Sequence, residues 1–269
     1  MSNNLNPKTM KTTKHMLIFI LLLSAGNITD AADQNRLEQL VVTPVASTPA
    51  QATSDWDDGA PYHDLKKGTK IVYTYYDGKG NVTGYSNQEI LQITHAQNSV
   101  EAVVSSTQTD KKGKIQGSGT VSLRYKNGNF HVDLLDIMQP QQMQAIDTEV
   151  EASGRDMIIP GKLSPGQTLP DAQATFKMKV KSGGAAFDLP SLTFRVSNRR
   201  ALQAESVETP MGKFACFKIT QTVEADYPLI GKQHFTSITW IGKGIGVIKT
   251  EVYDKKGKLQ SRMLLTELK

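Results

Sequence analysis

A histidine and an aspartate stand two residues apart, at His131 and Asp133, in a run that is typical of a β-strand. Side chains at positions i and i+2 of a strand face the same side of a sheet, so this pair could form half of a metal site or of a proton-transfer pair. A partly exposed polar strand face explains the same spacing without chemistry and is the favoured interpretation. A hydrolase would need a further partner from a distant segment.

The single cysteine, Cys216, is the second residue that could carry chemistry. A reactive thiolate needs electropositive and partly exposed surroundings, whereas Cys216 lies between Ala215 and Phe217 in an apolar run. We therefore expect a buried, structural side chain. One cysteine also excludes an intramolecular disulfide framework and zinc sites of the Cys/His finger type.

Acidic pairs give no firmer sign of catalysis. Glu149 and Glu151 would share a strand face, and Glu205 and Glu208 would do so only with a bulge between them. Spacing along the chain does not supply the carboxylate separation on which glycoside hydrolysis depends. The segment Asp55–Gly59 resembles a calcium loop but lacks the glutamate at loop position 12.

The glycine-rich stretch Gly242–Gly246 leads from one strand-like run into another, which predicts a tight hairpin and not a phosphate-binding loop. We therefore assign no catalytic, cofactor-binding or metal-binding residue and expect no cofactor. Whether the protein is an enzyme stays open, with a non-catalytic role favoured.

Aromatic side chains could line a concave sheet and bind an apolar or sugar ligand. The candidates are Tyr73, Tyr75, Tyr76, Tyr85, Trp240 and Tyr253. Aromatic residues are also common in strands, so core packing is the favoured interpretation for each of them. For Trp240 in particular we expect a residue that anchors the fold.

The elements that must position these residues are β-strands. From Lys66 onward, Val, Ile, Thr, Tyr and Phe alternate with polar residues, and turns with Asp at the first position and Gly three residues later recur at 77–81, 110–114 and 254–258. An Asn-Gly turn at 127–128 adds a fourth hairpin signal. We expect strands at about 69–76, 82–93, 99–108, 115–125, 129–137, 147–152, 174–181, 191–197, 200–208, 213–225, 233–241, 245–253 and 258–267.

These strands predict an all-β fold with little helix, an antiparallel meander that curls into a barrel, half-barrel or sandwich. A Pro- and Gly-rich connection at 160–173 separates two sets of strands, and short helices are predicted only at Gln34–Val42 and Pro140–Ile146. Residues 62–269 are expected to form a single large antiparallel β domain.

The N-terminus carries an export signal. Lys8, Lys11 and Lys14 precede an apolar run from Met16 to Leu23, followed by small residues up to Ala31, which is typical of a signal peptide covering residues 1–31. The run is too short for a transmembrane anchor, which needs about 20 apolar residues. No cysteine follows it to carry a lipid. Residues 32–61 are predicted to be a flexible linker, because their Pro-, Ala- and Thr-rich composition shows no strand periodicity. We expect a protein that is soluble in the periplasm or otherwise exported.

The formal charge of +5 falls to about +3 without residues 1–31, and lysines gather at predicted turn tips such as Lys111 and Lys112. This distribution argues against a nucleic-acid partner, which would need a basic patch with interleaved aromatic residues.

Four segments together resemble a group of exported, β-rich proteins of Gram-negative bacteria called TapB-like. They are residues 65–80, 166–171, 209–218 and 240–251, and the Gly212–Lys218 and Trp240–Val247 stretches carry most of the likeness, which covers about 62–269. The resemblance implies a single β-sheet domain in the cell envelope and supplies no catalytic residues.

Three functions remain open. The first is a non-catalytic envelope protein that binds an apolar or envelope-derived ligand, or a protein partner, on a curved sheet. The second is an assembly or interaction component without a small-molecule pocket, and the third, less favoured, is a hydrolase. An empty concave side of the sheet would favour the first, and a filled interior with an exposed apolar patch would favour the second.

Overall fold

The computed structural model describes residues 66–97, 99–134, 148–182, 185–227 and 231–269. Within these ranges the chain forms one antiparallel sheet of thirteen strands. The strands are β1 (Lys70–Asp77), β2 (Val82–Ala96), β3 (Ser99–Asp110), β4 (Ile115–Lys126), β5 (Asn129–Val132), β6 (Thr148–Arg155), β7 (Met157–Pro160), β8 (Ala172–Ser182), β9 (Ala185–Thr209), β10 (Gly212–Tyr227), β11 (Gly231–Gly242), β12 (Gly246–Asp254) and β13 (Leu259–Leu268).

The sheet curls into a nearly closed barrel, as the predicted meander requires. Its order is β6-β8-β9-β10-β11-β12-β13-β1-β2-β3-β4-β5-β7, so the last strand pairs with the first. The two edge strands, β6 and β7, are consecutive in the chain with only Asp156 between them. β6 pairs with β8, and β7 pairs with β5. One extended segment therefore reaches both edges of the sheet.

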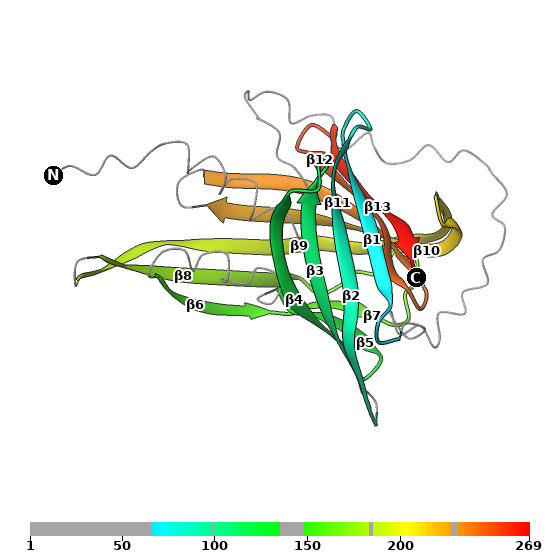
Figure 1. Cartoon of the computed structure of the whole chain (residues 1–269), viewed down its shortest axis with the longest axis horizontal. Coiled ribbons are helices and arrows are strands. Elements are labelled where there is room, and N and C mark those ends of the chain that lie inside the picture. The colour runs from blue at the N-terminus through cyan, green and yellow to red at the C-terminus, as the bar shows by residue number, and fades with distance from the viewer. Residues whose placement is uncertain (1–65, 98, 135–147, 183–184, 228–230) are drawn as a thin grey trace.

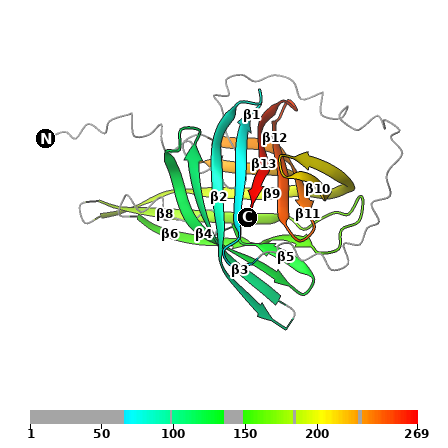
Figure 2. The ribbon, with the colours of Figure 1, turned by 45° about the vertical axis from the view of Figure 1, so that its right-hand side comes forward.

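The barrel is built from two strand groups that run in different directions. Figure 1 shows β1 to β4 crossing in front of β6, β8 and β9, whose far ends extend beyond the crossing. The turned view in Figure 2 shows the same arrangement, with the C-terminus beside β1 and β13. The interior of the barrel lies where the two groups face each other.

The hairpin turns form as their residues predict. In the turn after β1, the Asp77 carboxylate accepts hydrogen bonds from the backbone N–H groups of Lys79 and Asn81, at 2.8 and 2.9 Å. Gly80 takes a φ of 86°, which closes the hairpin. The turns that begin at Asp110 and Asp254 repeat this geometry.

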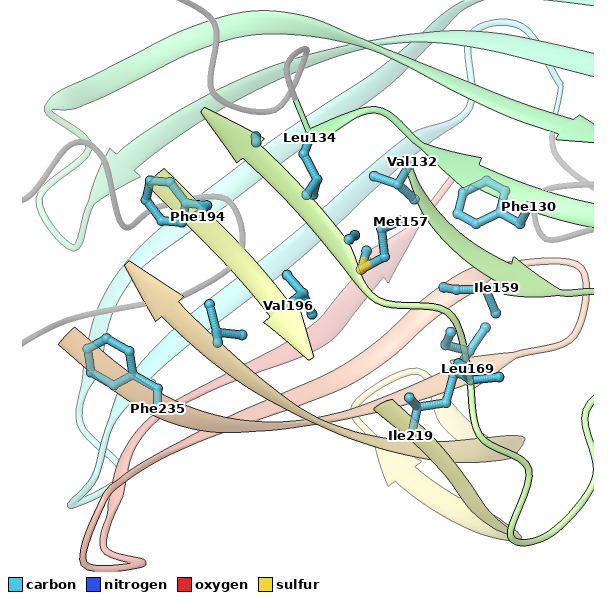
Figure 3. Close-up of a cluster of buried hydrophobic side chains, with 14 of the residues drawn as sticks. Phe130, Val132, Leu134, Met157, Ile159, Leu169, Phe194, Val196, Ile219 and Phe235 are labelled. Carbon is cyan, nitrogen blue, oxygen red and sulfur yellow. The ribbon is translucent and has the colours of Figure 1, made fainter. Parts of the chain in front are cut away.

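The core consists of two clusters of buried side chains. The larger one brings together residues of β5, β7, β9 and β10 with Leu169, and Figure 3 shows Phe130, Val132, Met157 and Val196 pointing toward one another. The smaller one contains Ile71, Ile90, Val104 and Leu265. In β1 the predicted alternation is confirmed, because Ile71, Tyr73 and Tyr75 are all buried.

The structure differs from the predicted strands in three places. The runs 191–197 and 200–208 were expected as separate strands, but both belong to the single strand β9, which bends without breaking. The short strand β7 was not predicted, because four residues are too few to show periodicity. The expected strand 129–137 ends earlier, at Val132. The signal peptide 1–31, the linker 32–61 and the helices at Gln34–Val42 and Pro140–Ile146 lie outside the described residues.

Candidate functional site: a mostly apolar cavity inside the barrel

The barrel interior is hollow between the two strand groups, where a cavity of about 210 Å³ lies. Apolar side chains form much of its wall, among them Val121, Leu123, Val132, Met157, Ile219 and Met263. Hydroxyl and amide groups interrupt this wall, including those of Tyr75, Ser86, Gln108, Gln221, Ser237 and Thr239. A small, mostly apolar cavity with a few convergent polar groups is typical of a ligand site.

Arg199 is the one lining residue with a formal charge, among the residues that the structure describes. It reaches the interior because β9 carries a bulge. Arg200 pairs with Thr220 and Ser197 pairs with Thr222, so Asn198 and Arg199 together oppose Gln221 on β10. Asn198 has a φ of 52°, in the left-handed region that suits such a bulge. The bulge re-aims the strand, and Arg199 is only 1% exposed.

The guanidinium of Arg199 is held by neutral acceptors. Nε donates to the Gln221 side-chain oxygen at 3.2 Å, and Nη1 donates to the carbonyl oxygens of Ile158 and Pro170 at 2.9 and 2.6 Å. Nη2 is buried and has no hydrogen-bond partner in the described part of the chain. Burial lowers the pKa of Arg199 to about 10, while the charge of Asp171 acts in the opposite direction. The group therefore stays cationic at neutral pH.

A row of polar side chains continues from Arg199 across the inner face. Gln221 on β10 lies opposite Ser237 on β11, and both are buried. The Ser237 hydroxyl oxygen is buried and has no partner among the described residues. Two cavity-lining residues, Arg199 on β9 and Ser237 on β11, thus each carry a buried polar atom without a partner in the described part of the chain, and β10 lies between their strands. Most buried polar groups are hydrogen-bonded, so each exception calls for an explanation.

Two of the six aromatic candidates line the cavity. The Tyr73 hydroxyl donates to the carbonyl oxygen of Val247 at 3.0 Å. Burial raises the pKa of Tyr75 to about 12, although a hydrogen bond with Ser86 opposes this. Tyr76, Tyr85, Trp240 and Tyr253 are not among the lining residues.

Trp240 belongs to a cluster of charged side chains instead. Its indole N–H donates to Glu205, and the ammonium groups of Lys249 and Lys218 lie 4.2 and 5.2 Å from its ring centre. The side chain is buried together with Cys216 in the smaller apolar cluster. This setting agrees with the expected role as a fold anchor.

His131 and Asp133 meet partners from two other segments. His131 Nδ1 lies 3.4 Å from the Asp156 carboxylate, and Arg124 lies 3.8 Å from Asp133 and 3.5 Å from Asp156. The four side chains are partly exposed, and none of them lines the cavity. Among the residues with described positions, no group of three or more His, Cys, Asp or Glu could hold a metal ion.

The remaining candidate residues that the structure describes are buried in the core, lie on opposite faces of a strand or form a turn. Cys216 is buried as expected, and burial followed by the nearby charge of Glu205 raises its pKa to about 12. Glu205 and Glu208 pair with Cys216 and Lys213 without a bulge between them, so they face opposite sides of β9. The side chain of Glu149 lies outside the described positions, and so does 55–59. Gly244 and Gly246 form the expected hairpin, with φ values of 72° and 100°.

Sequence reasoning missed Arg199, although a signal was present. Val196 and Ala201 are small apolar residues five positions apart, and an odd separation puts two strand residues on opposite faces. Both are fully buried, which is possible only because β9 is irregular between them. Two apolar residues at an odd separation, with an asparagine that tolerates positive φ at position 198 between them, could have indicated a β-bulge.

Comparison with known proteins agrees with this fold. The model of a family described as DUF3108-like matches residues 66–265. No curated protein matches the chain. The matched range falls within the 62–269 span of the resemblance to the TapB-like group, and the TapB-like name itself stays a prediction.

Two solved structures share the architecture. One is a candidate exported protein with a YmcC-like fold from Bacteroides fragilis NCTC 9343, with 23% identity, a TM-score of 0.61, and coverage of 78% of this chain and 98% of that one. The other is a candidate lipoprotein from Parabacteroides distasonis ATCC 8503, with 22% identity, a TM-score of 0.62, and coverage of 78% and 97%. At 22–23% sequence identity, the similarity to these two structures establishes the fold alone. In the described ranges, no helix has the length and apolar character needed to cross a membrane.

Proposed function

This chain belongs to the DUF3108-like family, and we propose that it is an exported, non-catalytic cell-envelope protein that binds an apolar or envelope-derived small molecule inside its barrel. Export is supported by the predicted signal peptide at 1–31 and by the descriptions of the two similar structures as candidate exported protein and lipoprotein.

The cavity is the observation that carries this proposal. A cavity of about 150 Å³ holds benzene, so 210 Å³ is enough for a somewhat larger apolar group, such as a short acyl chain. Large exposed apolar side chains in the described part of the chain are Leu91, Ile115, Leu202 and Met211, which come from separate segments. This distribution favours a ligand inside the barrel over a partner on an apolar outer patch.

A neutral fluorescent probe, N-phenyl-1-naphthylamine, tests the proposal. We expect saturable binding to the purified mature protein and competition by 1-octanol. The variant Thr239→Phe places a ring in the cavity and should abolish both. Thr236→Phe is the matched control, because Thr236 lies on the same strand but not on the cavity wall, and it should bind normally. Equal binding by both variants, or none by the unmodified protein, would contradict a site in the barrel.

A further inference from the structure

We infer that the ligand of this cavity is an amphiphile with an anionic head group, and that Arg199 binds this head group. The inference rests on the proposed function and adds the chemical class of the ligand. Its starting point is a cation in an otherwise uncharged, mostly apolar chamber.

The charge of Arg199 has no counter-ion at contact distance in the described structure. Its three hydrogen bonds go to one amide and two backbone carbonyl oxygens, which satisfy donors but do not neutralise a charge. Asp171 interacts with it only as a nearby charge, without a hydrogen bond or ion pair to it. A buried charge without a partner is unfavourable, so structure alone gives little reason to keep an arginine here.

Two buried polar groups, Arg199 Nη2 and the Ser237 hydroxyl, could donate hydrogen bonds to an oxyanion. Arg199 and Ser237 both line the cavity, and among the described residues neither the buried Nη2 of Arg199 nor the buried hydroxyl of Ser237 has a hydrogen-bond partner. Gln221 lies between the two on the middle strand, so their backbones are about 10 Å apart, two strand spacings. The Arg199 side chain reaches the side chain of Gln221, to which its Nε donates, so one carboxylate or phosphate with several oxygen atoms could accept from both Arg199 and Ser237.

The remaining wall suits an apolar tail. Val121, Leu123, Val132 and Met157 line the cavity from β4, β5 and β7, and their side chains offer no hydrogen bonds. Volume limits the tail to a short or medium length within the barrel. The geometry thus matches a carboxylate or phosphate monoester head joined to an apolar chain.

Isothermal titration with four octyl compounds tests this assignment. Octanoate and octyl phosphate carry anionic heads, 1-octanol is neutral, and octyltrimethylammonium is cationic. We expect both anions to bind at least tenfold more tightly than 1-octanol and the cation not to bind. The tighter anion tells whether the natural head is a carboxylate or a phosphate.

Two variants tie this preference to Arg199. Gln221→Glu keeps the size of the side chain and places a carboxylate on Arg199 Nε, so octanoate and octyl phosphate should no longer bind more tightly than 1-octanol. Arg199→Met should have the same effect if it folds. Arg195→Met on the same strand, an exposed site, is the matched control and should keep the preference.

Each outcome decides one of the two proposals. Equal affinity for octanoate and 1-octanol in the unmodified protein would overturn the role of Arg199 and leave the proposed function standing. An anion preference that survives in Gln221→Glu would also overturn that role. No binding of any octyl compound would overturn the proposed function and this inference together.

Discussion

Trp240 shows how one side chain can join an apolar cluster to a charged surface. It is 4% exposed, its indole N–H reaches Glu205, and two lysine ammonium groups lie over its ring. We predict that Trp240→Ala lowers the free energy of unfolding by about 3–5 kcal/mol, because a large apolar area and its contacts are lost. Trp240→Phe keeps most of that area and should cost clearly less. Urea denaturation measures both; an unchanged stability with lost octyl-compound binding would make Trp240 a ligand residue.

Glu251 shows what a buried carboxylate contributes. Burial by itself would raise its pKa, but hydrogen bonds from Tyr253, Lys249 and Arg262 outweigh burial and lower the pKa below its ordinary value. A lowered folded-state pKa stabilises the protein above the ordinary value, near pH 4.5, and this contribution is lost as the pH falls through the folded-state value.

We predict that Glu251→Gln lowers stability by about 1–3 kcal/mol at pH 7, the range for hydrogen bonds to charged groups. The difference from the unmodified protein should shrink as the pH falls below 4.5. Thermal melts from pH 3 to pH 7 measure it. Glu267→Gln, at an exposed pair with Lys269, is the control and should change little at any pH. A difference that grows toward low pH would contradict the assigned direction.

At the scale of the element, the bulge in β9 decides where Arg199 points. Asn198 holds a positive φ, and its side chain donates to Thr222 at 3.4 Å. We predict that Asn198→Val costs about 1–2 kcal/mol, because a β-branched residue is strained there, while Asn198→Gly is nearly neutral. Chemical denaturation measures stability, and octanoate titration measures whether the anion preference falls with the bulge. Equal stability of the two variants would mean that the backbone does not require this conformation.

The hairpin turns behave differently from the bulge, because their geometry is local. An aspartate and a glycine three residues later are enough to close the loop, and each contact lies within five residues. The bulge instead depends on the register between β9 and β10, which is set by the strands on either side of it.

At the scale of the whole molecule, closure of the barrel depends on its C-terminal strands. β12 and β13 link β11 to β1, so they join the end of the chain to its first strand. We predict that truncation after residue 239 leaves β1 and β11 with unpaired edges and gives an aggregating protein. Size-exclusion chromatography and light scattering of the exported chain would test this. A monomeric, folded truncated protein would show that the other strands close without them.

The sequence by itself determined most of the strands, the turns and the buried state of Cys216, Ile71, Tyr73 and Tyr75, because period-two alternation and turn chemistry are local properties. It placed His131 correctly in a strand, but β5 ends at Val132, one residue before Asp133, and the sequence could not supply Asp156 and Arg124, which come from other segments. The hollow interior and the inward Arg199 were decided only by the tertiary structure. A cavity is the space left between walls that lie far apart in the chain, and a bulge changes which face a residue takes, so neither can be read from the spacing of residues in one segment.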